Sequence, residues 1–324
     1  MNILVSGGAG FIGSFTVDRL IKDNHNVVVV DSLINSNIDS VNKRATFYKI
    51  DIRDKEGLTQ VFRENEIDVV LHFAALISAP ESMDKPYEFF SVNTYGTLTL
   101  LEVMNNHGVK KIVFSSTAAV YGLLDKGDDV IFEDDEVLPI NIYGESKLQA
   151  EKIIEWSSKS KGIDYIIFRY FNVAGHLKRG INPIERKALI PSVMNVACGI
   201  KDKLLVYGDD YNTKDGSCIR DYIHVDDLVN AHVLGCSMLV AKTTDNGIYN
   251  LGNGHGNTVF EVINTAEKVI GIPIPYESAP RRVGDPVISV ASSNKAKDKL
   301  GWIPSRNLEE IINDEWKEIK KYKS

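Results

Sequence analysis

Short, mostly apolar runs recur along the first half of the chain and alternate with stretches of helical spacing. The runs are 3–5, 27–30, 46–50, 68–73, 111–114 and 165–168. Runs that are apolar at nearly every position are typical of parallel strands buried on both faces of a sheet. The pattern therefore predicts an α/β fold in which a doubly wound parallel sheet carries helices on both faces.

A glycine-rich turn follows the first predicted strand. Gly7, Gly10 and Gly13 stand three apart before a helical pattern that reaches Ile21. Glycines at these positions let the backbone turn tightly and approach a pyrophosphate, whose charge the helix N-terminus stabilises. The second strand ends at Asp31, where a carboxylate can accept both ribose hydroxyls and repels a 2′-phosphate, so NAD is favoured over NADP. This order of elements predicts a Rossmann-type dinucleotide-binding domain.

The residues after the third strand have two interpretations. Asp51 and Ile52 offer a carboxylate and an apolar side chain, which could hold an adenine ring. Asp51 could equally well cap the helix that starts near Lys55. The sequence leaves both open.

Small and polar residues surround the fourth strand. Ala74 and Ala75 follow it and are small enough for the backbone to lie against a cofactor. His72 lies inside the apolar strand, where a hydrogen-bonded core histidine is a better interpretation than a catalytic one. A long helix is expected over 86–107, and Asn93 within it is a candidate polar contact to the loops on the cofactor side.

A tyrosine and a lysine four residues apart carry the candidate chemistry. Tyr143 and Lys147 fall on one face of a predicted helix, so both can reach the same bound molecule. A nearby ammonium favours the phenolate, and we therefore expect Lys147 to lower the pKa of Tyr143. Thr117 stands at the C-terminal end of the fifth strand, where ligands bind in open α/β sheets, and could relay or orient the proton. Alone, the pair more often indicates an amphipathic surface; the other motifs favour catalysis.

The alternation loosens after about residue 175. A short helix over 189–198 and a strand over 204–207 indicate a smaller C-terminal α/β substrate-binding lobe. We therefore predict a dinucleotide-binding domain over 1–175 and the substrate lobe over 176–324. The segment near 226–252 reads as a helix and a strand and is a candidate to return to the main sheet.

Composition narrows the functional classes. The chain has 324 residues and a net charge of −7, which speaks against a nucleic-acid partner. Its apolar runs are too short to span a bilayer, and we expect neither a membrane segment nor a signal peptide. Cys198, Cys218 and Cys236 are scattered and have no ligand spacing, so we expect reduced thiols in the cytoplasm and no metal site.

Motifs along almost the whole chain resemble the extended short-chain dehydrogenase/reductase family, and more narrowly its UDP-glucose (UDP-galactose) 4-epimerases. Besides the glycine turn and Tyr143-x-x-x-Lys147, they are Phe114-Ser115-Ser116-Thr117, Arg169-Tyr170-Phe171-Asn172, Arg220-Asp221-Tyr222-Ile223-His224-Val225, Tyr249-Asn250-Leu251-Gly252 and Ala279-Pro280-Arg281-Arg282-Val283-Gly284-Asp285.

The resemblance implies an isomerase of galactose metabolism that keeps NAD bound and uses it as a transient hydride acceptor. Tyr143 would take the proton from the 4-hydroxyl of the UDP-sugar, with Lys147 favouring the phenolate and Thr117 bridging to the substrate. A 4-keto sugar would turn over and take the hydride back on its other face. The catalytic residues implied are thus Thr117, Tyr143 and Lys147.

The resemblance also implies contacts along the cofactor and along the nucleotide sugar. The cofactor residues it implies are Gly7, Gly10, Phe11, Ile12, Gly13, Asp31, Ser32, Asn35, Ser36, Asp51, Ile52, Phe73, Ala74, Ala75, Ile77, Asn93, Tyr143, Lys147 and Phe171. The substrate residues it implies are Thr117, Tyr143, Asn172, Leu189, Leu205, Val206, Tyr207, Arg220, Arg282, Asp285 and Ser289. Arginine meets a diphosphate bidentately, which fits Arg220 and Arg282.

Three positions and one stretch depart from the family pattern. Ile77 stands where some relatives have a lysine near the cofactor phosphates, and Ala188 where an Asn or His often touches the substrate diphosphate. The stretch 176–186 is short and basic where an acidic loop is usual. Ser289 replaces the bulky tyrosine of some epimerases, which leaves room for an N-acetyl group and extends the expected substrates to UDP-GlcNAc and UDP-GalNAc.

Other functions compete with this interpretation. A nucleotide-sugar 4,6-dehydratase needs an acid/base pair after the threonine, and here Ala118 and Ala119 follow Thr117. A decarboxylase would need a uronic-acid substrate, and the Arg282 segment matches epimerases better. A non-catalytic NAD sensor would usually lose the tyrosine or the lysine. By family resemblance, the helices over 86–107 and 143–160 are expected to pair in a homodimer.

Overall fold

The large unit of the structure is a seven-stranded parallel sheet. The computed structural model describes residues 1–124, 130–176, 178, 180–181, 186, 188–282 and 284–323. The sheet order is β10-β6-β5-β4-β1-β2-β3, and every neighbouring pair is parallel. Its strands are β1 (Asn2–Ser6), β2 (Asn26–Asp31), β3 (Thr46–Lys49), β4 (Val69–His72), β5 (Lys111–Thr117), β6 (Asp164–Tyr170) and β10 (Gly247–Leu251). The predicted doubly wound sheet is confirmed.

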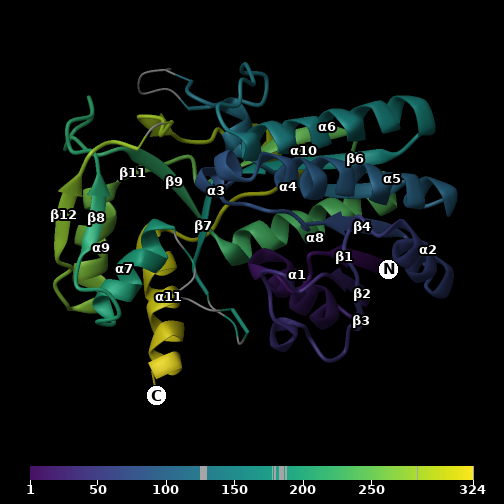
Figure 1. The fold of residues 1–324 in the computed structure, drawn as a ribbon, viewed down its shortest axis with the longest axis horizontal. Coiled ribbons are helices and arrows are strands. Elements are labelled where there is room, and N and C mark those ends of the chain that lie inside the picture. Colours follow the sequence, from purple (N-terminus) through teal and green to yellow (C-terminus); the bar gives the residue numbers. More distant parts are fainter. Residues whose placement is uncertain are drawn as a thin grey trace.

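Helices cover both faces of this sheet, as its apolar strands require (Figure 1). One core cluster packs α1 (Phe11–Lys22) and α8 (Val225–Ala241) against one face. A second cluster packs α2 (Lys55–Glu64), α5 (Gly96–Asn106) and α6 (Ile142–Lys161) against the other. The strand order reverses between β1 and β4, and in open sheets ligands bind at the carboxyl ends of the strands at such a point.

The predicted helix over 86–107 forms as three consecutive segments. They are α4 (Pro86–Phe89), the π-helical η2 (Phe90–Tyr95) and α5, and α3 (Ala79–Asp84) precedes them. A π turn inside a helix often marks a functional site. Asn93 lies within it. Two short 3-10 helices, η1 (Ile38–Ser40) and η3 (Ala118–Tyr121), follow β2 and β5.

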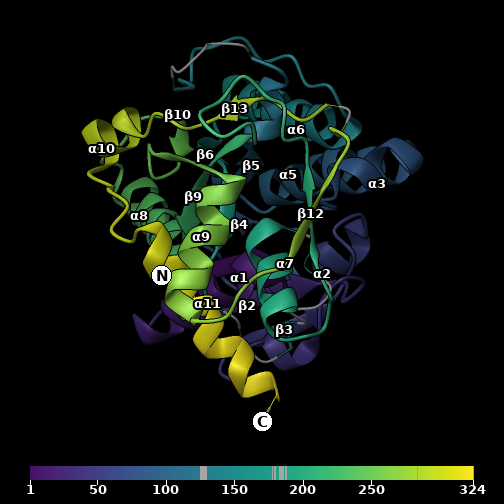
Figure 2. The same cartoon turned by 90° about the vertical axis from the view of Figure 1, so that its left-hand side faces the viewer.

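The smaller lobe has its own hydrophobic core. Figure 2 shows the molecule from the side of this lobe. A mixed sheet joins β7 (Asn172–Ala174), β9 (Ile219–His224), β11 (Gly256–Thr258) and β13 (Ile288–Ser289), and a parallel pair joins β8 (Leu204–Tyr207) to β12 (Tyr276–Ala279). The helices α7 (Leu189–Ala197), α9 (Val259–Ile270) and α11 (Leu308–Lys323) pack together beside them.

The segment 226–252 does return to the main sheet. Helix α8 packs on α1, and β10 pairs with β6 from Gly247↔Ile166 to Leu251↔Tyr170. Helix α10 (Asn294–Leu300) packs against β10 and α8. The large unit therefore contains chain from both predicted domains. The division at residue 175 stays a prediction, although β6 does run almost directly into β7 there.

Candidate active site

The glycine turn links the ends of β1 and β4. Gly7 has a φ of +73°, and a Cβ there would lie 2.5 Å from the backbone nitrogen of Ala74. A Cβ on Gly13 would lie 2.2 Å from the carbonyl oxygen of Gly7, so helix α1 packs directly on the turn. No side chain caps the N-terminus of α1, and its first turn carries no acidic residue. Its free N–H groups and its dipole therefore suit a pyrophosphate.

Asp31 is held rigidly beside this turn. Its carboxylate accepts hydrogen bonds from the N–H of Ala9 at 3.0 Å, the N–H of Leu33 at 2.9 Å and the hydroxyl of Ser36 at 2.8 Å. An ionised carboxylate has about four acceptor positions, so roughly one remains for a ligand. The charge stays at the position where it would repel a 2′-phosphate. Ser32 and Asn35 belong to the loop after β2 and are half-buried and exposed, respectively.

The cap interpretation of Asp51 is wrong. Asp54 caps α2 by accepting from the N–H of Gly57 at 3.0 Å. The carboxylate of Asp51 instead binds Arg53, whose Nε and Nη2 lie 2.8 and 2.7 Å away, and these hydrogen bonds lower the pKa of Asp51. Ile52 is buried in the core under α5, so its side chain supports the sheet. The cap interpretation lay three residues too early because both aspartates precede the same helix.

The loop after β4 is fixed by Asn93, as expected for a polar contact to that loop. Its side-chain oxygen accepts from the N–H of Leu76 at 2.8 Å, and its amide donates to the Leu76 carbonyl and to the Ser146 hydroxyl. Phe73 packs against the His232 ring in a tilted contact, with the ring centroids 4.7 Å apart. Ala74 and Ala75 are half-buried, and Ile77 is exposed. The loop is thereby tied to α6.

His72 is a core histidine, as predicted. Its Nδ1 lies 2.7 Å from the Ser6 hydroxyl and its Nε2 lies 2.9 Å from the Thr97 hydroxyl. Burial lowers its pKa to about 3, so the ring is neutral at pH 7. It therefore supports the strand ends without acting as an acid or base.

Thr117 and Tyr143 meet at the carboxyl edge of the sheet. Thr117 ends β5, and Tyr143 is in the first turn of α6, where Asn141 caps the helix. The tyrosine hydroxyl is hydrogen-bonded to Thr117. Tyr170, the register partner of Thr117 on β6, lies beside them with its hydroxyl against the Ser115 hydroxyl. The three predicted catalytic residues thus come from neighbouring elements at the edge where ligands bind.

Burial changes the expected pKa of Tyr143. Desolvation raises it above its ordinary value, and the hydrogen bond with Thr117 only opposes this rise. Desolvation also lowers the pKa of Lys147 to about 7. The expected lowering of the tyrosine pKa is therefore wrong for the protein by itself, because burial outweighs the groups that favour the phenolate. A further positive charge is needed to favour the phenolate.

A buried ion pair begins one helical turn beyond Lys147, and it is a feature that sequence reasoning missed. Glu151 is four residues beyond Lys147, and its carboxylate binds Arg169 of β6, with Nη2 at 2.6 Å and Nε at 3.0 Å. The hydroxyl of Ser116 also donates to Glu151. The signal was present: a Tyr-x-x-x-Lys-x-x-x-Glu series puts a second charge on the face of the helix that meets the sheet.

Several predicted substrate residues of the small lobe lie near the end of β8 and the beginning of β9. The Arg220 guanidinium lies 3.9 Å from the Asp285 carboxylate, and Arg282 lies over the Tyr207 ring at 3.7 Å. Ser289 is the register partner of Arg220. Val283 of the same motif lies outside the described residues. The structure therefore brings two arginines, a carboxylate and an aromatic ring into one region.

The remaining substrate candidates are spread over the lobe. The Asn172 amide donates to the Asp221 carbonyl at 3.1 Å, and Leu189 begins α7 half-buried. Leu205 is exposed, whereas Val206 points into the lobe core, so only its backbone can face a ligand. Phe171, a cofactor candidate, follows the end of β6 and packs with Tyr121 and Leu148 in a separate cluster.

One group of potential metal ligands occurs among the described residues, away from the catalytic edge. His176, His224 and Asp226 bring their ligand atoms within 4.8 Å of one another. Arg306 already lies 3.1 Å from the Asp226 carboxylate, and the Asp226 N–H donates to Nδ1 of His224. Neutral His224 therefore carries its proton on Nε2. These features favour an ion-pair cluster.

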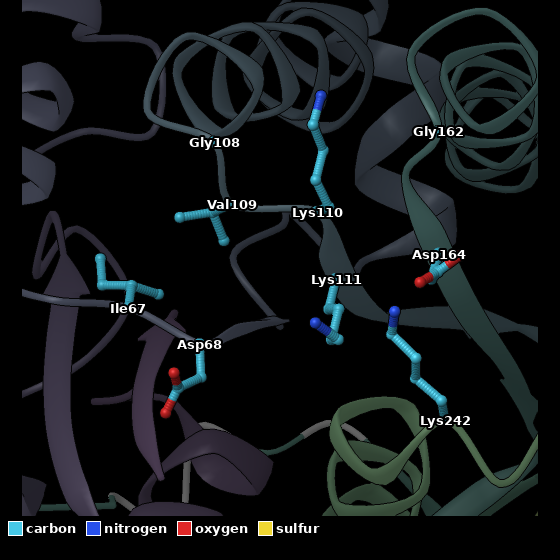
Figure 3. Close-up of a pocket in the computed structure, with 9 residues that line it drawn as sticks. All are labelled: Ile67, Asp68, Gly108, Val109, Lys110, Lys111, Gly162, Asp164 and Lys242. Atoms are coloured by element: carbon cyan, nitrogen blue, oxygen red, sulfur yellow. The ribbon is translucent and has the colours of Figure 1, made fainter.

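A surface hollow of about 490 Å³ lies at the opposite edge of the sheet. Figure 3 shows Lys110, Lys111 and Lys242 around it with Asp68 and Asp164, at the amino ends of β4, β5 and β6. Ligands of open α/β sheets bind at the other edge, so we do not assign this hollow to the site.

Among the helices of the described residues, none combines the length and the hydropathy that a membrane span requires.

The geometry defines the class of protein. A glycine turn at the point where the strand order reverses, beside a Thr–Tyr–Lys group at the same edge, is the arrangement of a dinucleotide-dependent α/β enzyme.

Comparison with known proteins identifies the family. Residues 3–252 match the model of the NAD dependent epimerase/dehydratase family. A UDP-glucose 4-epimerase of Lacticaseibacillus casei is 46% identical over 320 residues, which cover 98% of this chain and 96% of the relative. A crystal structure of a UDP-glucose 4-epimerase superposes with a TM-score of 0.95 at 46% identity, covering 100% of this chain and 99% of the other.

A third relative carries ligands. The UDP-glucose-4-epimerase of Stenotrophomonas maltophila, solved with NAD and formylated UDP-arabinopyranose, has a TM-score of 0.93 at 36% identity and covers 100% of this chain and 99% of that one. This chain belongs to the NAD dependent epimerase/dehydratase family.

Proposed function

We propose that the protein is an NAD-dependent 4-epimerase that interconverts UDP-glucose and UDP-galactose. The observation that supports the proposal is the approach of Thr117 and Tyr143 at the carboxyl edge of the sheet, with Lys147 one helical turn further along α6. The relatives named above support the reaction, since two of them are UDP-glucose 4-epimerases at 46% identity.

The residues around the strand reversal fit NAD. The uncapped N-terminus of α1 suits the pyrophosphate, and the Asp31 carboxylate suits an unphosphorylated ribose. When bound, the nicotinamide ring supplies a reversible hydride acceptor and a positive charge. Because burial raises the pKa of Tyr143 in the protein alone, we assign to that charge the larger part in favouring the phenolate.

In this mechanism Tyr143 removes the proton of the sugar 4-hydroxyl and later returns it. Thr117, already hydrogen-bonded to Tyr143, holds the substrate hydroxyl in line with the phenolate. Lys147 adds positive charge on the face of α6 that also carries Tyr143. Epimerisation requires the 4-keto sugar to present its other face, so the nucleotide must be held firmly while the sugar stays loose. Arg220 and Arg282 suit the diphosphate, and Asp285 suits the uridine ribose.

The test is conversion of UDP-galactose by purified protein without added NAD, resolved by NMR. We expect the 4-epimer to appear, and Tyr143→Phe to lose turnover while keeping its NAD. Retained turnover in Tyr143→Phe would mean that the assigned base is wrong. No conversion by the parent protein with NAD bound would refute the proposed substrate pair.

Ser289 extends the proposal to N-acetylated sugars. Its side chain is small and half-buried on β13, opposite Arg220 of β9. We propose that UDP-GalNAc and UDP-GlcNAc are also interconverted. Ser289→Tyr should then reduce turnover of UDP-GalNAc and leave that of UDP-galactose within a few-fold. Equal loss for both substrates would argue against a role in sugar selection.

The 4,6-dehydratase alternative lacks an acid/base pair. Ala118 and Ala119 follow Thr117 in η3, and neither can move a proton. Nothing in the described site supplies a carboxylic acid at that position. The alternative would require elimination of water from the sugar, which the NMR experiment also detects.

We propose a cytoplasmic homodimer that uses the outer faces of α4, η2, α5 and α6. These segments pack side by side (Figure 1) and expose large apolar side chains, with Tyr87 88% and Trp156 67% exposed. Tyr95 of η2 and Leu98 of α5 are exposed on the same segments. Exposed apolar groups of this size are typical of protein–protein interfaces. Cys198, Cys218 and Cys236 are buried thiols, which supports a reducing compartment.

A further inference from the structure

The stability of the fold alone does not explain the buried ion pair of Glu151 and Arg169. Both side chains lie within the large unit, where Glu151 is 1% and Arg169 3% exposed. Lys147 is also 3% exposed. Taking two charges out of water is costly, and a buried pair is often no more stabilising than apolar residues of similar size. A pair in this place therefore calls for a role besides stability.

Every group of the pair is hydrogen-bonded. The Glu151 carboxylate accepts from Nε and Nη2 of Arg169 and from the Ser116 hydroxyl. Arg169 Nη1 donates to the Tyr121 hydroxyl at 3.1 Å, which donates to Asn250 on β10 at 2.8 Å. The carboxylate is thus fixed by three strands, because β5, β6 and β10 each contribute a residue to the network.

The pair lies near two of the three catalytic candidates along the chain, Thr117 and Lys147, and next to Tyr170. Ser116 precedes Thr117, Glu151 follows Lys147 by one helical turn, and Arg169 precedes Tyr170. In the β5–β6 register Ser116 pairs with Arg169 and Thr117 with Tyr170. Lys147 itself lies over the Phe114 ring at 4.4 Å, two residues before Ser116. Moving Glu151 would therefore disturb both the strand that ends in Thr117 and the helix that carries Lys147.

We propose that Glu151, held by Arg169 and Ser116, is a positioning residue that provides the counter-charge for Lys147, one helical turn away on α6, and keeps it aligned for the reaction. The proposal rests on the proposed function, because it takes Tyr143 as the base that Lys147 serves.

The charges around Lys147 support this role. Glu151 raises the Lys147 pKa against the desolvation that brings it to about 7. His72 on β4 is neutral because burial and the Lys147 charge lower its pKa to about 3. On β6, burial raises the pKa of Tyr170 above its usual range, so it too is neutral, and the Arg169 charge is matched by Glu151. Tyr143 is the remaining titratable group, on α6 itself.

The experiment compares Glu151→Gln with Glu155→Gln, a matched change one turn further along α6, in the NAD-bound protein. Turnover is measured against pH. Loss of an adjacent opposite charge should lower the Lys147 pKa, so the alkaline limb of the profile should move to lower pH by about 1 to 3 units. Glu155→Gln should leave the limb in place. An unmoved limb in Glu151→Gln overturns the proposal.

A second readout separates this proposal from the epimerase assignment. The phenolate of Tyr143 is titrated by its near-ultraviolet absorbance, as the difference between each protein and its Tyr143→Phe counterpart. In Glu151→Gln the phenolate should form at higher pH than in the parent, whether or not UDP-galactose is turned over. The same titration in both proteins would refute the role of Glu151 even if epimerase activity is found.

Two further variants test whether misfolding or a change in the position of Glu151 explains the result. If Glu151→Gln does not fold with Arg169 unpaired, Glu151→Gln combined with Arg169→Gln keeps hydrogen-bonding groups and removes both charges, and its limb should still move down. Ser116→Ala leaves the carboxylate charge in place, so turnover should fall without a shift of the limb. A shift of equal size in Ser116→Ala would show that the effect is structural and would reject the charge role.

Discussion

The hydroxyl of Tyr143 on α6 is hydrogen-bonded to Thr117 at the end of β5. This bond joins a helix to the neighbouring strand at the edge where ligands bind in open sheets. Burial raises the pKa of Tyr143 in the protein, so the site is poised as a neutral acid until additional positive charge arrives. The order of events at the site follows: the cofactor must be in place before the tyrosine can act as a base.

Replacing Tyr143 by Phe removes only the hydroxyl at this edge. We expect turnover of UDP-galactose to fall by about 10²- to 10⁴-fold, the usual contribution of a positioned acid or base. Thr117→Val should cost less, and Thr117→Ser should retain most activity because it keeps the hydroxyl. Steady-state kinetics with circular dichroism as a folding control measure this. A Thr117→Val variant as active as the parent would exclude a role for that hydroxyl.

Two glycines of the same turn should respond differently to alanine. A Cβ on Gly13 would lie 2.2 Å from the Gly7 carbonyl oxygen, whereas a Cβ on Gly10 meets nothing closer than 3.3 Å. Gly13→Ala should therefore lower the free energy of unfolding by about 3 kcal/mol, in the range of overpacked sites. Gly10→Ala should fold with a change of less than about 1 kcal/mol.

The same pair tests the cofactor site. Gly10 lies at the uncapped N-terminus of α1, where a methyl group would obstruct a pyrophosphate. We expect Gly10→Ala to be purified with less NAD than the parent, measured by absorbance after the protein is denatured. Equal NAD content in Gly10→Ala would place the pyrophosphate elsewhere.

Buried neutral histidines should make the protein acid-sensitive. Burial lowers the pKa of His72 to about 3 and those of His224 and His232 to about 4, from 6.5. In that window the unfolded chain binds protons that the folded chain does not, so the free energy of unfolding should fall as pH drops from 6.5 towards 4. Over this pH range each histidine contributes at most ~3 kcal/mol. Urea unfolding at a series of pH values measures the slope.

His232→Leu isolates one of these groups. The ring packs against Phe73 and Phe168, and its Nε2 has no hydrogen-bond partner, so leucine suits the same space. Between pH 4 and 6.5, the pH dependence of the free energy of unfolding should weaken by about one proton. His176 serves as contrast, because its hydrogen bond with Asp226 raises its pKa. An unchanged slope in His232→Leu would mean that the ring is not neutral in the folded protein.

The proposed dimer should depend on its aromatic side chains. Tyr87 and Trp156 are exposed on helices that pack side by side. Tyr87→Arg combined with Trp156→Arg should shift the protein from dimer to monomer in light scattering, because charges are unfavourable at the centre of an interface. Ile303→Arg, at a residue 60% exposed after α10, is the matched control and should change nothing. A parent that is already monomeric would refute the proposed assembly.

The sequence by itself determined the features that depend on spacing within one element. Apolar runs identified the strands, Gly7, Gly10 and Gly13 identified the turn, and the four-residue spacing put Tyr143 and Lys147 on one helix face. These properties follow from the local periods of helices and strands, which neighbouring residues reveal directly. The match of the site to the family rests on the same local motifs.

Only the tertiary structure decided what those residues meet. It chose Asp54 over Asp51 as the cap, brought β10 back beside β6, and joined Glu151 to Arg169 under Lys147. It also reversed the expected pKa shift of Tyr143, because desolvation depends on everything packed around the hydroxyl. Register and burial arise from segments far apart in the chain, so no local pattern contains them.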